Sequence, residues 1–147
     1  MSDVDERFMR RCLELALASR DAGESAVGSL LVRDGVIVAE AEEATRRNLD
    51  PSAHSELEAI RRACTELGTA DLSDCTMYTT VEPCFLCGYV IRTVGIPRVV
   101  MATDCGEIGS VGSRYAFLTD PSFEGWSTPP VVDRGLLEKE ARALRGA

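Results

Sequence analysis

The sequence predicts an α/β fold, a three-layer α/β/α sandwich with a central five-stranded mixed sheet. Segments with helical periodicity alternate with short segments rich in β-branched side chains, and Asp34-Gly35 separates two of these as in a hairpin. A hairpin followed by strand–helix units gives a mixed sheet with helices on both faces. No linker, repeat or low-complexity tract interrupts the 147 residues. We therefore expect a single domain over residues 1–147.

The first third of the chain predicts one helix and the strand hairpin. Residues 5–20 repeat apolar and small side chains at helical spacing. Residues 26–32 and 36–39 are β-rich and flank the Asp-Gly turn. The polar stretch 40–50 is predicted to be a loop.

The remaining elements follow from the same signals. Asp50-Pro51-Ser52 combines a capping acid with a proline typical of a first helical turn, and Gly68 is a stop signal. A helix is therefore expected between them. Further on we expect strands at 76–81, 98–102 and 131–132, a helix opened by Pro83, and a final helix from about 135 to 144.

His54-Ser55-Glu56, followed by Pro83-Cys84-Phe85-Leu86-Cys87, predicts a catalytic zinc site. Zinc accepts one imidazole and two thiolates, which His54, Cys84 and Cys87 would supply, and an open fourth position can hold water. Zinc makes that water a nucleophile near neutral pH. Glu56, which is not a ligand, can carry the proton to a ring nitrogen and to leaving ammonia. Such a pattern is typical of hydrolytic deaminases.

The two halves of the motif are expected to meet at helix starts. His54 is predicted in the first turn of one helix and Cys84 in the first turn of another. Cys84 and Cys87 are three residues apart, so both thiolates face one side of their helix. The partial positive charge of helix N-termini favours ionised thiolates there.

Two structural interpretations compete with the catalytic site. A Cys-x-x-Cys pair can be a redox motif or half of a structural zinc site. A structural site needs four protein ligands, yet the remaining cysteines show no second short spacing. A non-catalytic, zinc-stabilised binding domain therefore stays as the alternative from another functional class.

Composition restricts the partners. Twenty-four acidic against sixteen basic residues give a net charge of −8, which argues against nucleic acid, because phosphates require a basic surface. No apolar run approaches the roughly 20 residues of a membrane span, and the N-terminus lacks a signal peptide's pattern. Six cysteines without an export signal indicate thiols in a reducing compartment. We expect a cytoplasmic protein without a membrane partner.

The segments Asp50–Glu56 and Tyr78–Cys87 resemble the cytidine deaminase-like superfamily, in particular the branch of cytosine, guanine and tRNA adenosine deaminases. The resemblance covers nearly the whole chain. Residues 95–100 look most like cytosine deaminases, whereas 109–113 and 135–138 look more like tRNA adenosine deaminases. The resemblance implies a homodimer or a higher oligomer, in which neighbouring subunits help to form the pocket walls.

One position departs from this branch. Its members usually place an asparagine eleven residues before the metal histidine, where the amide contacts substrate, and Glu43 stands there here. An ionised carboxylate only accepts hydrogen bonds, so Glu43 in the pocket would prefer a ring rich in N–H groups. In the alternative, Glu43 is a solvated loop acid. Val27 and Phe85 are weaker candidates for substrate contacts, and Phe85 would more often be a core residue.

The sequence thus predicts a zinc hydrolase that replaces an exocyclic amino group of a small aminated heterocycle with oxygen and releases ammonia. A free base of cytosine type is the first expectation and guanine or another aminopurine the second. Deamination of the wobble adenosine of tRNA is the alternative.

Overall fold

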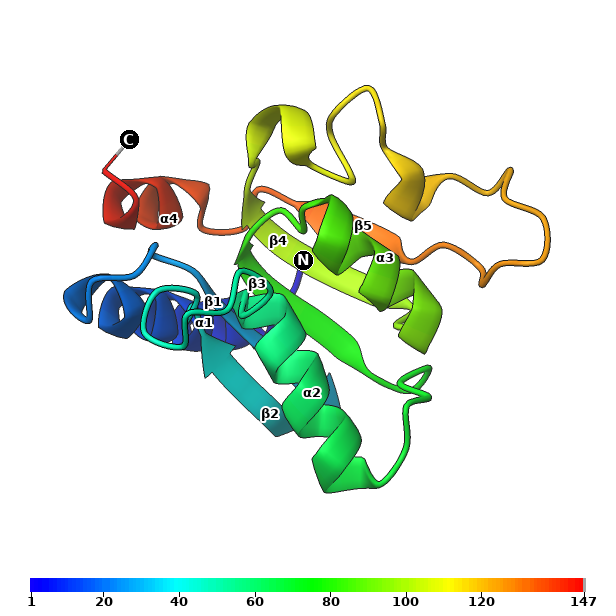
Figure 1. The fold of residues 1–147 in the computed structure, drawn as a ribbon, viewed down its shortest axis with the longest axis horizontal. Coiled ribbons are helices and arrows are strands. Elements are labelled where there is room, and N and C mark those ends of the chain that lie inside the picture. Colours follow the sequence, from blue (N-terminus) through cyan, green and yellow to red (C-terminus); the bar gives the residue numbers. More distant parts are fainter. Residues whose placement is uncertain (147) are drawn as a thin grey trace.

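The computed structural model describes residues 1–146 and has three layers (Figure 1). The middle layer is a five-stranded sheet, and helices cover both of its faces. The elements are α1 (Asp3–Asp21), β1 (Gly28–Arg33), β2 (Val36–Glu42), α2 (Ser55–Leu67), β3 (Thr76–Val81), α3 (Phe85–Val94), β4 (Arg98–Thr103), the short 3-10 helices Gly106–Ile108 and Phe117–Thr119, β5 (Val131–Arg134) and α4 (Glu138–Leu144).

The sheet is mixed, with strand order β2-β1-β3-β4-β5. The hairpin strands β1 and β2 pair antiparallel, and β1 pairs antiparallel with β3. The pairs β3–β4 and β4–β5 are parallel, and α3 is the crossover between β3 and β4. This arrangement confirms the predicted fold class. It also brings the ends of β3 and β4 to one edge of the sheet, where α3 begins.

Successive side chains of the strands point to opposite faces of the sheet and pack into two separate cores. On one face, Leu31, Met77 and Val99 pack beneath α2 and α3. On the other face, the neighbouring positions Leu30 and Tyr78 pack with residues of α1 and α4. Because each central strand is buried on both sides, it contributes side chains to both helical layers.

The predicted start of α2 is wrong by several residues. Asp50 does not cap the helix; its Oδ1 accepts hydrogen bonds from the backbone N–H and the hydroxyl of Ser52, at 2.9 and 2.7 Å. This local turn competes with a helix N-cap for the same acceptor. The helix begins instead at Ser55, with His54 at its N-cap. Cys84 likewise occupies the N-cap of α3 and does not lie inside its first turn.

Two further boundaries differ from prediction. The strand β2 continues to Glu42, into the stretch predicted as loop. The last helix begins at Glu138 and not near Gly135, because Gly135 and Leu137 have φ values of 85° and 55°, outside the helical region. No helix within residues 1–146 is both long and apolar enough to cross a bilayer.

Candidate zinc site and substrate cavity

The N-caps of α2 and α3 bring together one histidine and two cysteines. The Nδ1 atom of His54 lies 3.5 Å from Sγ of Cys84 and 3.4 Å from Sγ of Cys87. All three ligand atoms lie within 4.8 Å of one another. Tetrahedral zinc with ordinary Zn–N and Zn–S bonds would separate N from S by about 3.6 Å. The spacing and chemistry of the three donors therefore fit zinc.

One sulfur of this cluster is anionic at neutral pH. Hydrogen bonds from Cys87 and His54 lower the pKa of the Cys84 thiol to about 4. The same thiolate raises the pKa of His54 to about 9. The N-terminus of α3 adds its partial positive charge beside Cys84 and so favours the thiolate form. An anionic sulfur is thus available without any larger rearrangement.

Glu56 lies in the first turn of α2, directly beside this cluster. Its residue is 4% exposed, and burial raises the pKa of its carboxyl to about 7. Oε1 accepts a hydrogen bond from the hydroxyl of Thr79 at 2.9 Å, while Oε2 lies 3.6 Å from Sγ of Cys87. One oxygen is therefore fixed by the sheet and the other faces the cysteine cluster. A pKa near neutrality suits a group that both takes and gives a proton.

Hydroxyl groups beneath Glu56 were not found by sequence reasoning. Ser29 of β1 donates to Thr79 at 2.9 Å and lies 2.7 Å from the hydroxyl of Ser55. All three are buried. The sequence signal was a hydroxyl residue within a largely apolar strand, Ser29 before Leu30 and Thr79 between Met77 and Val81, because a buried hydroxyl requires a hydrogen-bond partner. The network holds the carboxylate in one orientation.

A cavity of about 670 Å³ opens above His54 and Glu56. This lies within the roughly 300–1,000 Å³ typical of small-molecule sites. Two predicted substrate contacts, Glu43 and Val27, line it. Its outer wall is formed by the ends of α1 and α4, including Arg20 and Arg145.

Glu43 lines the cavity and is half-buried. Its Oε1 accepts a hydrogen bond from the backbone N–H of Ser55 at 2.8 Å, the first residue of α2. Since the N-cap residue His54 makes no side-chain cap, Glu43 supplies the acceptor that the helix start requires. Burial raises the pKa of this carboxyl. Its backbone N–H also donates to the carbonyl of Val27 at 3.1 Å, which joins the two cavity residues.

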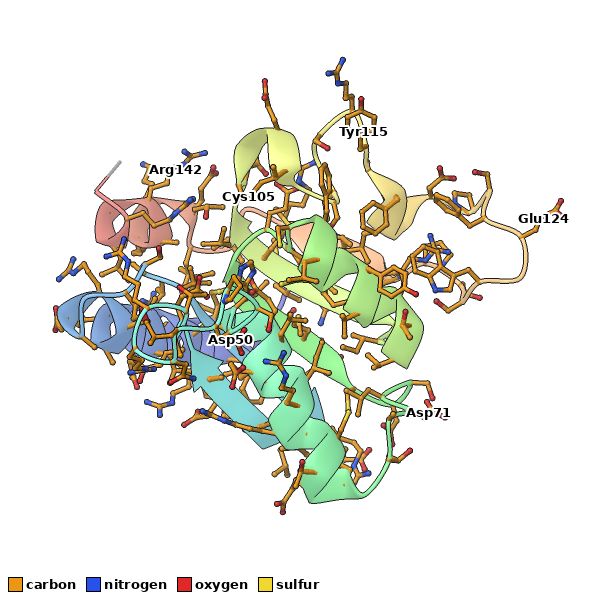
Figure 2. The ribbon with its side chains drawn as sticks, viewed as in Figure 1. Asp50, Asp71, Cys105, Tyr115, Glu124 and Arg142 are labelled. Carbon is orange, nitrogen blue, oxygen red and sulfur yellow. The ribbon has the colours of Figure 1, made fainter. Side chains whose placement is uncertain are left out.

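Phe85 lies elsewhere. It does not line the cavity above His54 but a second hollow with other aromatic side chains. Its ring centroid is 6.1 Å from those of Tyr115 and Phe117. Trp126 stacks on Phe117 in the same hollow. Tyr115 is labelled in Figure 2. The aromatic residues that line this second hollow form the aromatic face: Phe85, Tyr89, Tyr115, Phe117, Phe123 and Trp126.

Arg92 of α3 holds the loop that contributes Tyr115, Phe117 and Trp126 to the aromatic face. This guanidinium is buried in α3 and donates to the carbonyls of Phe117, Asp120 and Ser127 at 2.6–2.7 Å. Its carbon Cζ also lies 4.4 Å from the ring centroid of Trp126, a cation–π distance. The loop between β4 and β5 is therefore attached to α3 through its main chain.

The geometry agrees with comparisons to known proteins. A family described as the cytidine and deoxycytidylate deaminase zinc-binding region matches residues 2–103. The chain belongs to the cytidine and deoxycytidylate deaminase family. It is therefore a zinc-dependent enzyme that hydrolyses C–N bonds, and the alternative of a non-catalytic zinc-stabilised domain is wrong.

Relatives of this deaminase act on different purines. A tRNA-specific adenosine deaminase of Aquifex aeolicus is 33% identical over 138 residues, which is 92% of this chain and 91% of the relative. A guanine deaminase of Bacillus subtilis is 38% identical over 108 residues, 71% of this chain and 69% of the relative.

Solved structures show the same two groups. A tRNA:A34 deaminase studied for A-to-I editing at the wobble position has a TM-score of 0.87 and 32% identity, and covers 94% of this chain and 98% of its own. The guanine deaminase of Bacillus subtilis has a TM-score of 0.68 and 32% identity, and the match covers 100% of this chain and 96% of the guanine deaminase chain.

Proposed function

We propose that this deaminase hydrolyses the exocyclic amino group of a purine, with the wobble adenosine of tRNA as the first candidate. The observation that carries the proposal is the position of Glu56. Its buried carboxylate faces the His54, Cys84 and Cys87 cluster at the floor of an open cavity. A ring placed in that cavity would meet the metal donors and a proton carrier together.

In this proposal each group has a separate task. His54, Cys84 and Cys87 would hold zinc, which would supply the activation of water at neutral pH. Glu56 accepts the first proton of the attacking water on Oε2 and passes it to the ring nitrogen. It then takes the proton of the hydroxyl bound to the ring carbon and gives it to the departing ammonia, as that carbon becomes a carbonyl. Thr79 keeps Oε1 hydrogen-bonded throughout, so the free oxygen stays aimed at the reacting atoms.

The tRNA candidate rests on the relatives and on the cavity mouth. The similarity to the tRNA-specific adenosine deaminase of Aquifex aeolicus extends over 92% of this chain. Arg20 and Arg145 line the outer cavity wall, where guanidinium groups could contact the phosphates on either side of an inserted nucleotide. With a net charge of −8, binding would depend on such local contacts and weaken steeply with salt.

A free aminopurine is the second candidate, and Glu43 favours it. Its carboxylate lies in the cavity wall and can only accept hydrogen bonds when ionised. Guanine presents a ring N–H and an amino group, both donors. The cytosine-type base that the sequence favoured gains no support from these relatives, whose names specify guanine and tRNA adenosine.

One experiment separates the candidates. Zinc-loaded protein is incubated with a tRNA carrying adenosine at the wobble position, and inosine is read by sequencing. Guanine, adenine, adenosine, cytosine and cytidine are assayed in parallel for ammonia, with Glu56→Gln as the inactive control. Inosine formation supports tRNA, and ammonia from guanine alone supports the free base. If neither inosine nor ammonia forms, the purine proposal is refuted.

Three coarser expectations belong to the same proposal. We propose that residues 1–147 form one catalytic domain in a reducing, cytoplasmic setting, which agrees with six free cysteines. We also propose a homodimer. The exposed aromatic face supports it, because Tyr89 and Tyr115 are each 58% exposed and exposed apolar patches commonly mark protein contacts. Light scattering on the zinc-loaded protein would show twice the chain mass.

A further inference from the structure

Glu82 is a buried carboxylate to which the deaminase chemistry assigns no task. It follows β3 directly and precedes Pro83 and Cys84, and it is 2% exposed. No lysine or arginine among residues 1–146 forms an ion pair with it. A buried carboxylate without a cation requires several hydrogen-bond donors, because its desolvation is otherwise very costly.

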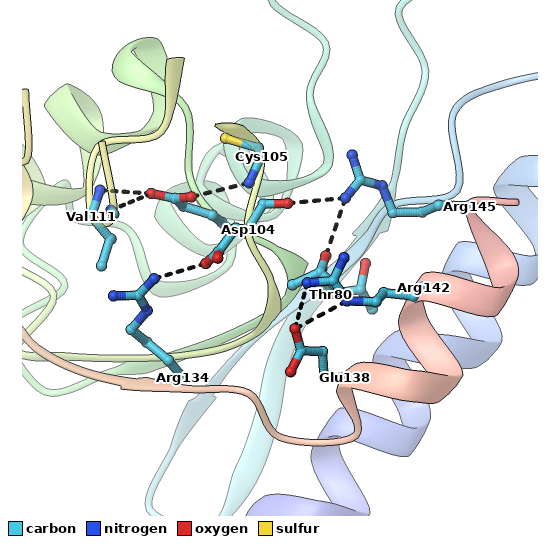
Figure 3. A network of polar contacts seen from close by, with 11 residues as sticks. Thr80, Asp104, Cys105, Val111, Arg134, Glu138, Arg142 and Arg145 are labelled. Carbon is cyan, nitrogen blue, oxygen red and sulfur yellow. Dashed lines mark hydrogen bonds and ion pairs between the residues drawn. The ribbon is translucent and has the colours of Figure 1, made fainter. Parts of the chain in front are cut away.

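The donors all come from one loop, the segment 104–112 that follows β4. Oε1 accepts from the backbone N–H of Cys105 at 3.0 Å. Oε2 accepts from the N–H groups of Val111 and Gly112 at 2.9 and 2.7 Å. Figure 3 shows the bonds to Cys105 and Val111, which reach the carboxylate from the two ends of the loop. Glu82 therefore holds the two ends of the loop together.

The loop is shaped to admit this carboxylate. A Cβ atom on Gly109 would lie 2.2 Å from Oε2 of Glu82. Gly109 has an ordinary extended backbone, with φ −73° and ψ 136°. Glycine is thus required there for space and not for conformation. The small residue and the carboxylate fit each other.

The same loop contacts both the metal helix and the cavity. Gly109 forms a β-bridge with Cys84, and Ser110 donates to the carbonyl of Pro83 through its backbone N–H and its hydroxyl. On its inner side the loop presents Cys105 and Ile108 to the cavity above Glu56. Whatever holds the loop therefore sets one wall of the substrate cavity.

We propose that Glu82 is a positioning residue that fixes the 104–112 loop as a cavity wall and so determines substrate binding. Glu82 itself borders the cavity, but its carboxylate oxygens accept hydrogen bonds from the loop N–H groups and from none of the three metal donors. It acts through Cys105 and Ile108, whose places depend on the loop. Without the hydrogen bonds to Glu82, the cavity wall would move, while the three zinc donors at the starts of α2 and α3 would stay in position.

The test compares Glu82→Gln with Glu107→Gln, an exposed acid in the same loop that makes no hydrogen bond through its side chain. Glutamine keeps the shape but places an NH2 group against a backbone N–H. We expect about one zinc per chain in both variants. In Glu82→Gln, kcat/KM on the parent's best substrate should fall about 10- to 100-fold. Most of this change should be a rise in KM, because misplaced residues of the cavity wall bind the substrate less well. Glu107→Gln should stay within about twofold.

A second readout needs no substrate. The backbone N–H of Leu118 donates to the carbonyl of Ser110 and does not touch Glu82. If Glu82 holds the loop, this amide should exchange with deuterium at least about tenfold faster in Glu82→Gln than in Glu107→Gln. Gly109→Ala, which displaces the carboxylate without removing it, should reproduce both effects and provides a second variant if Glu82→Gln does not fold.

The proposal is overturned if Glu82→Gln and Gly109→Ala match the control in KM and in exchange, or if zinc is lost along with activity. It rests on the proposed function only for the choice of substrate. Should the parent deaminate nothing in the panel, the proposed function fails, and the exchange comparison still decides the role of Glu82.

Discussion

Replacing Asp5 with asparagine should weaken the fold in a way that depends on pH. Asp5 of α1 is buried and accepts hydrogen bonds from both terminal nitrogens of Arg98 at 2.9 and 3.0 Å. The hydroxyl of Tyr78 in β3 donates to it at 2.6 Å. Together these donors hold the pKa of Asp5 well below its usual range, and Arg98 is the larger cause. The carboxylate thus joins the N-terminal helix to β3 and β4.

The size of the effect follows from exposure. Removing one partner of a fully buried ion pair costs about 3–5 kcal/mol. Arg98 is 33% exposed and keeps its bond to Asp133 at 2.7 Å, so a loss of about 2 kcal/mol is expected, within the range for charged hydrogen bonds. At roughly 2–4 °C per kcal/mol for a chain of about this size, Tm should fall by about 4–8 °C at pH 7.

The sign of the pH dependence is set by the lowered pKa. A carboxylate whose folded pKa is depressed stabilises the fold fully above its unfolded pKa of about 3.9, and this stabilisation is lost as the pH falls below that value. The difference in Tm between parent and Asp5→Asn should therefore be largest at pH 7 and shrink toward pH 3. Acid loss of zinc affects both proteins alike and cancels in the difference.

The assay is thermal unfolding by circular dichroism across this pH range, with Asp3→Asn as the matched control. Asp3 is an exposed acid in the same helical turn. A Tm difference that stays constant from pH 7 to pH 3 would refute the reasoning. So would an Asp3→Asn protein as destabilised as Asp5→Asn.

Three predictions concern the site itself. Cys87→Ala should lower zinc content and activity together, because each donor supplies one of only three protein bonds; full zinc by elemental analysis in this variant would exclude Cys87 as a ligand. Glu56→Gln should fold and keep zinc while turnover falls by about 10²–10⁴-fold, and a rate near the parent's would mean that another group moves the proton. Glu43→Asn should change the ranking of guanine, cytosine and cytidine by kcat/KM more than it changes Tm, since a mismatched buried polar contact costs about 1–3 kcal/mol; unchanged ratios would make Glu43 a cap of α2 only.

Features governed by near neighbours in the chain were predictable. The Asp34-Gly35 turn set the hairpin, and residues 76–81 form the predicted strand. The three metal donors were also predictable, since zinc restricts the donor types and the motif spacing was specific. The structure brings Nδ1 of His54 within 3.4–3.5 Å of both sulfurs, although His54 and Cys84 occupy helix N-caps and not the predicted first turns.

Features that depend on distant partners were not predictable. One miss was local: Asp50 accepts hydrogen bonds from Ser52, two residues on, and so closes a turn and does not cap the helix. Glu43 could be placed in the wall only once Ser55 was seen to lack another acceptor. Glu82 gave a weak signal, an acid between an apolar strand and a proline, but its donors lie 23 to 30 residues away.

The attachment of Arg92 to its loop has a consequence for how this enzyme can vary. The guanidinium binds the carbonyl oxygens of Phe117, Asp120 and Ser127, and every residue type carries a carbonyl. Side chains along the loop can therefore be exchanged without loss of its path, as long as Arg92 remains. The exposed surface of this loop can therefore diverge among relatives while the backbone beneath it stays the same. Saturation mutagenesis should find residues 119–122 permissive and Arg92 intolerant even of lysine, which lacks the planar fork.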